Sequence, residues 1–247
     1  MGLDDIAQNL SEEVSRSYLP FLNKVVEIMQ DNLVSVFLYG SATGINFIPK
    51  VSDINSVIVV KDINLQLLQK ILKPIAIAKR HRIEAPLIFT EEYIQSSLDV
   101  FPIEFLDMKE NYVVLYGKDV LKDIDVKDSY IRLFCEQQIK GKLIRIRQAY
   151  LELGLNKKGL ESLMKDSLTS LMAVFRSLIR LKKSDIPIDT EKLLSKIKDL
   201  FGIEVEVLLD IWRRKINNQH ISSSQINRYF DEYIQTLEKL AIAIDRL

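Results

Sequence analysis

The stretch LYGSATGINFIPKVSDINSVIVV, residues 38–60, contains the features from which we predict the fold. An apolar, strand-like run ends at Gly40 and Ser41, and a second apolar strand begins around Asp53 and Asn55. Because side chains alternate along a strand, Asp53 and Asn55 are expected to project from the same face. Polar side chains at the start of a buried strand are costly unless they find a partner. This stretch therefore predicts a pair of strands with a candidate site at one end.

The composition is that of an ordinary globular chain. Its 247 residues are 47% hydrophobic and 28% charged, and the formal net charge is zero. A neutral chain is not expected to bind nucleic acid or a membrane through its whole surface. Cys135 is the only cysteine, which excludes an intrachain disulfide and fits a reducing compartment. With no signal-like start and no long apolar run, these features predict a cytoplasmic protein without a membrane partner.

Apolar periodicity indicates that residues 1–124 form an α/β (α+β) domain with a mixed sheet, beginning with a helix over about residues 4–32. The predicted strands are LVSVFLYG (33–40), INSVIVVKD (54–62), IEAPLIFT (83–90), FPIEFLDMK (101–109) and YVVLYG (112–117). A helix over residues 64–82 is predicted between the second and third strands. A shorter one starts at Thr90, a suitable N-cap residue.

Residues 125–247 show only helical periods. Apolar stripes predict one helix from about residue 129, another over 160–181, two shorter ones near 190–201 and 205–217, and a serine-capped helix at the C-terminus. Short connections between amphipathic helices predict an all-α, up-and-down helical bundle. Such a bundle is also a candidate surface for a homodimer.

The opening stretch suggests phosphate chemistry. A glycine directly after a strand lets a phosphate approach the backbone, and a serine hydroxyl bonds its oxygens. Glu104 lies on the predicted strand 101–109, which would bring it beside Asp53 and Asn55 if the strands are neighbours. Oxygen ligands next to a phosphate-binding turn are typical of magnesium-dependent phosphoryl or nucleotidyl transfer.

These residues resemble the signature of the polymerase-beta-type nucleotidyltransferase superfamily: Gly-Ser, a gap, acid–apolar–acid, and a third acid on a later strand. Eleven residues separate Ser41 from Asp53, and the resemblance covers roughly residues 33–117. The helical remainder is similar in layout to the bundle of kanamycin-type nucleotidyltransferases. The resemblance implies that Gly40 and Ser41 hold the triphosphate of an NTP, most simply ATP. It also implies that Asp53 and Glu104 are catalytic residues and ligands of Mg²⁺.

Asn55 departs from this signature, because the family has its second acid there. An amide oxygen can coordinate magnesium but brings no negative charge, so a two-metal site should be weakened. The sequence therefore favours a nucleotidyltransferase-fold protein that binds a nucleotide with little turnover. One alternative is an active enzyme that moves a nucleoside monophosphate to a hydroxyl of a small molecule or a protein. Another is a structural protein in which Asp53 and Asn55 only begin a strand.

Lys142 and Arg145 follow one border of the first predicted bundle helix, where the resembled family has a basic phosphate contact. The alternative is a solvated helix edge. Arg214 and His220 have a spacing similar to that of HEPN-type helical ribonucleases, although such a spacing often arises by chance. Cys135 falls within an apolar stripe, which indicates a core position.

Overall fold

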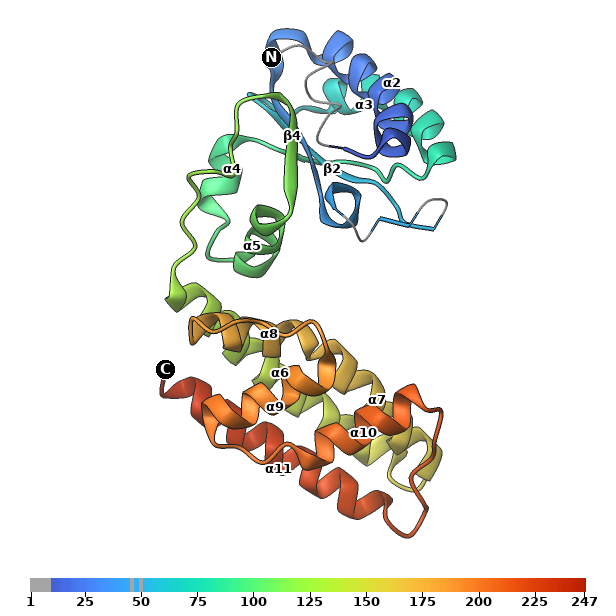
Figure 1. The fold of residues 1–247 in the computed structure, drawn as a ribbon, viewed down its shortest axis with the longest axis vertical. Coiled ribbons are helices and arrows are strands. Elements are labelled where there is room, and N and C mark those ends of the chain that lie inside the picture. The colour runs from blue at the N-terminus through green and yellow to red at the C-terminus, as the bar shows by residue number, and fades with distance from the viewer. Residues whose placement is uncertain (1–9, 45–46, 49–50) are drawn as a thin grey trace. The chain divides into compact units, whose positions relative to one another are not determined.

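The computed structural model describes residues 10–44, 47–48 and 51–247, which form two compact units that divide after Val126 (Figure 1). The first unit contains a mixed sheet with helices, and the second is built from helices. The predicted fold class, a mixed-sheet domain followed by a helical one, is confirmed.

The sheet of the first unit has four strands in the order β3-β2-β1-β4. The strands are β1 (Leu33–Tyr39), β2 (Asn55–Val60), β3 (Leu87–Phe89) and β4 (Tyr112–Gly117). β1 is antiparallel to both β2 and β4, whereas β2 and β3 are parallel. Because β1 and β2 run in opposite directions, the end of β1 meets the start of β2.

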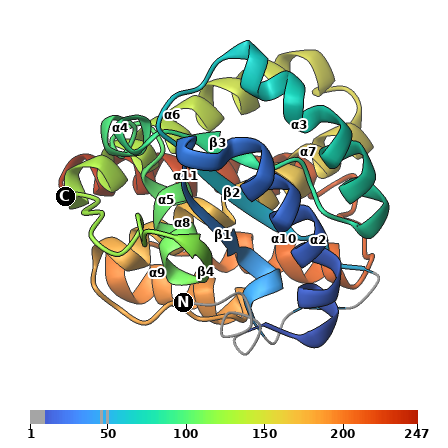
Figure 2. The ribbon, with the colours of Figure 1, turned by 90° about the horizontal axis from the view of Figure 1, so that it is seen from above.

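Two long helices, α2 (Glu12–Met29) and α3 (Leu65–Ala78), cover one face of the sheet and lie side by side (Figure 2). Pro20 and Pro74 lie inside these helices, and both helices continue through them. Residues 4–9 of the predicted N-terminal helix fall outside the described residues. The buried core between helices and sheet includes Tyr18, Leu22, Val36, Leu38, Ile54, Ile58 and Ile71.

The other face of the sheet is covered by α4 (Glu91–Ser96) and α5 (Pro102–Glu110). Thr90 caps α4 as predicted, since its side chain accepts a hydrogen bond from the backbone N–H of Tyr93 at 3.0 Å. The core on this side includes Phe37, Val57, Val59, Ile94, Phe105 and Met108.

The strand predicted over residues 101–109 is wrong, because this segment is the helix α5. Its short run of alternating apolar and polar residues fits a strand as well as a helix. Pro102 lies in the first helical turn, where a proline is favourable because its missing N–H needs no partner. Phe105 and Met108, three residues apart, are both buried, which is the helical spacing.

The second unit contains the helices α6 (Asp128–Leu153), α7 (Lys157–Ser170), α8 (Met172–Leu181), α9 (Thr190–Phe201), α10 (Glu206–Ile216) and α11 (Ile226–Asp245). The long helix α6 packs against α7, α8 and α11. The stripe predicted for this helix runs from Ile131 to Leu153. Its first five residues are buried on α6, namely Ile131, Cys135, Ile139, Leu143 and Ile146, whereas Tyr150 and Leu153 are half-buried.

Two details of the predicted bundle are wrong. The helix expected over residues 160–181 is divided at Leu171 into α7 and α8. The last helix begins after Gln225 without a side-chain cap, so it is not capped by a serine. Among the described residues, no helix combines the length and the apolar character that crossing a bilayer requires.

Candidate functional site

The turn after β1 begins at Gly40, which has a φ of 74°. This left-handed conformation favours glycine, and it leads into a short 3₁₀ turn, Gly40–Thr43. The Thr43 hydroxyl donates to the Gly40 carbonyl at 2.8 Å, and the Gly40 N–H donates to the carbonyl of Asn111 at 3.0 Å. The Gly40 N–H is therefore already bonded, while the half-buried Ser41 hydroxyl has no partner among the described residues.

The strand register brings several of the predicted site residues to one end of the sheet. Asn55 is the first residue of β2 and pairs with Tyr39, the last residue of β1 and the neighbour of Gly40. Asp53 lies two residues before Asn55, so its side chain is expected on the same face of the sheet. Burial raises the pKa of the half-buried Tyr39, which keeps its hydroxyl protonated. The pairing thus brings Asn55 next to the turn at Gly40, with Asp53 two residues before it in the chain.

Asp53 is paired with an arginine. The Arg82 guanidinium donates from Nη2 to Asp53 Oδ1 at 2.8 Å. The same guanidinium also donates to the backbone carbonyls of Val51 and Ser52, so it holds the segment that leads into β2. Arg82 follows the end of α3 and has a φ of 58°. A positive charge thus occupies the position beside Asp53 where a cation would bind.

Glu84 is a site candidate that the sequence reading missed. Ile54 and Ile83 form a parallel bridge, with the Ile54 N–H bonded to the Arg82 carbonyl and the Glu84 N–H bonded to the Ile54 carbonyl. This register places Glu84 opposite Asn55, just as it places Arg82 opposite Asp53. The sequence signal for Glu84 was its position as an acid directly before the apolar run of the third predicted strand. The sequence does not specify that this strand pairs in parallel with β2, so the signal was not recognised.

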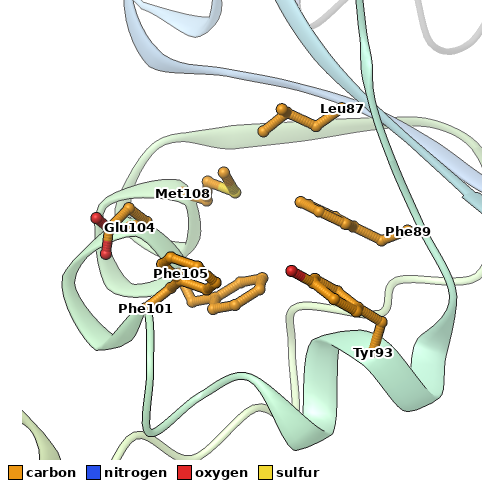
Figure 3. Close-up of a pocket in the computed structure, with 7 residues that line it drawn as sticks. All are labelled: Leu87, Phe89, Tyr93, Phe101, Glu104, Phe105 and Met108. Atoms are coloured by element: carbon orange, nitrogen blue, oxygen red, sulfur yellow. The ribbon is translucent and has the colours of Figure 1, made fainter.

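Glu104 lies in the first turn of α5, so the strand that was to carry it to Asp53 does not exist. The helix α5 covers the face of the sheet from which Asp53 and Asn55 project, since Phe105 packs in the same core as Val57. Within the described residues, no hydrogen bond or ion pair joins Glu104 to the strand end. Glu104 instead lines an aromatic cavity, with its carboxylate turned away from the rings (Figure 3).

Lys142 and Arg145 lie on α6 in the second unit, with Lys142 half-buried and Arg145 exposed. Burial lowers the pKa of Lys142, and the charge of Arg145 lowers it further. Their role as phosphate contacts stays a prediction from the resemblance.

The Arg214 and His220 pair is bonded through the backbone. Arg214 Nη1 donates to the His220 carbonyl at 2.9 Å, while the His220 ring lies 3.2 Å from the carboxylate of Glu161. Cys135 is buried as predicted, and burial raises the pKa of its thiol to about 12. A thiol with such a pKa is protonated and a poor nucleophile.

The arrangement at the strand end combines two carboxylates, an amide, a serine hydroxyl and a guanidinium. Among the residues that the structure describes, no three His, Cys, Asp or Glu side chains gather closely enough to hold a metal ion. As arranged, the donor set therefore does not suit Mg²⁺.

No protein-family model matches the chain, and no curated protein matches it. Among solved structures, the chain is similar to the crystal structure of spectinomycin adenyltransferase AAD(9) from Enterococcus faecialis with ATP and spectinomycin. The two chains are 12% identical, with 90% of this chain and 99% of that chain covered and a TM-score of 0.49. A likeness this distant carries no argument about the site.

Proposed function

We propose that the first unit is a nucleotidyltransferase-type module that binds the phosphates of a nucleotide, with ATP as the simplest ligand, and transfers little. The observation that carries this proposal is the ion pair between Asp53 and Arg82, together with an amide at position 55. In the turn that begins at Gly40, the Ser41 hydroxyl supplies the phosphate side of the site, because the Gly40 N–H already bonds the Asn111 carbonyl. Lys142 and Arg145 remain candidates for further phosphate contacts.

The charge at the strand end argues against efficient transfer. A two-metal site needs carboxylates shared between the cations, so that the ligands neutralise the ions and hold them in place. Asn55 contributes no charge, and Arg82 offsets the charge of Asp53. We derive no step through Mg²⁺ from this donor set, and we expect nucleotide binding that depends little on magnesium.

Nucleotide binding with and without magnesium tests the proposal. We expect ATP to bind the wild-type chain with similar affinity in both conditions, as measured by calorimetry, and Ser41→Ala to weaken it. Asn55→Asp should make binding depend on magnesium, because it adds the missing carboxylate beside Asp53. Gln69→Glu, on the exposed side of α3, is a control that adds the same charge elsewhere.

Two results would contradict the proposal. Equal responses of Asn55→Asp and Gln69→Glu would mean that residue 55 does not lie at a cation site. Absence of ATP binding in both conditions would favour the structural or interaction protein.

The active enzyme remains a second candidate because of Glu84. The Ile54–Ile83 bridge supports this candidate, because it pairs Glu84 with the start of β2, where a carboxylate could replace the missing acid. Transfer from an NTP labelled at its α-phosphate to a hydroxyl acceptor measures this directly. Turnover by the wild-type chain that disappears in Glu84→Gln would favour the enzyme, whereas no transfer in either form favours the binding module.

A further inference from the structure

An aromatic cavity lies between β3, α4 and α5, away from the turn at Gly40. Its volume is about 200 Å³. The residues that line it, shown in Figure 3, are Leu87, Phe89, Tyr93, Phe101, Glu104, Phe105 and Met108. Four of these seven side chains carry aromatic rings.

The rings form two walls of the cavity. Phe89 and Tyr93 stack with their ring centroids 5.3 Å apart and their planes 11° from parallel. The ring centroid of Phe105 lies 6.0 Å from that of Phe89. Tyr93 and Phe101 remain 45% and 41% exposed. Large apolar side chains that stay exposed around a hollow indicate a binding site, because water contact with them is unfavourable.

The chain around the cavity is acidic. Residues 91–110, which include α4 and α5, contain six acidic residues and one basic residue, in a chain whose net charge is zero. One of the six, Glu91, pairs with Lys118, so the segment keeps an excess of acidic residues. The basic residue, Lys109, donates to the Ile124 carbonyl at 2.7 Å. Among the described residues that line the cavity, Glu104 alone is charged, and Figure 3 shows its carboxylate turned away from the rings.

We propose that this cavity binds an alkylated ammonium group, such as a trimethylammonium head. The faces of aromatic rings carry negative charge density and attract a desolvated cation, and methyl groups on the nitrogen also gain apolar contact with the rings. The acidic surroundings attract a cation and repel a phosphate or carboxylate. A neutral apolar group of the same shape would gain only the apolar contact with the rings, without the attraction between a cation and the ring faces. The cavity binds its ligand whether or not the strand end binds a nucleotide.

Choline and its neutral carbon isostere, dimethylbutanol, separate charge from shape. Both are titrated into the full chain at low salt without nucleotide, and binding is measured by calorimetry. We expect choline to bind about fivefold to tenfold more tightly than the isostere, from the cation–π contribution. Because no nucleotide is present, failure here leaves the proposed function untouched.

Variants of the lining residues test whether choline binds in this cavity. Phe101→Leu and Tyr93→Leu keep apolar volume at exposed positions and remove a ring, so each should weaken choline about fivefold and change isostere binding less than about twofold. Met108→Leu is the matched control, since it changes a lining residue without removing a ring, and should leave choline binding within about twofold. Circular dichroism checks that each variant folds.

Four results would overturn the proposal. The first is equal affinity for choline and the isostere, and the second is no choline binding at millimolar concentration. The third is choline binding that persists in the double variant Tyr93→Leu with Phe101→Leu. Binding that Met108→Leu weakens as much as Phe101→Leu does would also overturn it, because the rings would then contribute nothing specific.

Discussion

Two of the ion pairs in this protein, one in each unit, differ in their surroundings. Asp53 bonds Arg82 at 2.8 Å in the first unit, and Glu161 bonds Lys165 at 2.5 Å in the second. The side chains of the first pair are 47% and 46% exposed, whereas those of the second are 7% and 15% exposed. The bond lengths are similar, so the difference lies in the access of water.

The burial of each pair decides how much it contributes to the stability of the fold. Water solvates either exposed partner when the bond between Asp53 and Arg82 breaks, so this pair costs little to separate. Glu161 has lost most of that hydration, and it is held by His220 as well as by Lys165, whose ammonium also donates to the Gln219 carbonyl at 2.8 Å. The buried pair therefore ties α7 to the segment before α11. Because the pair of Asp53 and Arg82 is exposed, another cation can replace Arg82 at Asp53, which a binding site requires.

The largest effect is expected from Glu161→Gln. Removing the carboxylate leaves the largely buried Lys165 without its counter-charge, which should lower the free energy of unfolding of the second unit by about 2–3 kcal/mol. Trp212, the only tryptophan, lies in α10 and reports on this unit by fluorescence during urea unfolding.

The control for this prediction is Glu238→Gln in the same unit. Glu238 bonds Arg147 at 2.5 Å, but the two side chains are 42% and 54% exposed. Its loss should change the free energy of unfolding by at most about 0.5 kcal/mol. Equal losses in the two variants would show that burial does not separate these pairs.

Lowering the pH should reduce the difference in the free energy of unfolding between the wild type and Glu161→Gln. Burial raises the pKa of Glu161, but the hydrogen bonds and charges of Lys165 and His220 outweigh this, so the pKa is below its ordinary value. A lowered folded-state pKa gives stability that is present above the unfolded pKa and is lost as pH falls through the folded pKa. From about pH 5 downward, unfolding of both proteins followed by Trp212 should therefore converge. A constant difference down to pH 3 would contradict this explanation.

The sequence predicted the fold better where apolar residues repeat at one spacing, helical or strand-like, over a long stretch. The predicted stripe of α6 keeps helical spacing from Ile131 to Leu153, and its residues as far as Ile146 are buried. The segment 101–109 is short, and its pattern fits both periods, so its helix was missed. The division at Leu171 was missed because the apolar spacing of α7 and α8 continues across it.

The candidate site was predictable only in part, for a similar reason. Gly40 directly follows β1, and Asp53 and Asn55 lie at the start of β2, so the antiparallel pairing of these two strands brings the turn and the start of β2 together. Arg82 and Glu84 reach the same end through the parallel pairing of Ile83 with Ile54. That register depends on how α3 crosses the sheet, which a residue pattern does not encode.

Arg82→Gln should have a smaller effect on stability than Glu161→Gln. It removes an exposed ion pair, so we expect the melting curve followed by circular dichroism to change by less than about 1 kcal/mol in unfolding free energy. Lys24→Gln, which removes the exposed pair with Glu27, is the control in the same unit.

The effect of Arg82→Gln on cation binding should be larger than its effect on stability. Without the guanidinium, Asp53 can accept a divalent ion, and Mn²⁺ affinity measured by electron paramagnetic resonance should rise about threefold or more, because one positive charge has left the site. Lys24→Gln removes the same charge far from Asp53 in sequence and should leave that affinity unchanged. An equal rise in both variants would mean that the net charge of the unit governs cation binding. In that case Arg82 would serve only to hold the segment before β2, and the exposed pair would be as structural as the buried one.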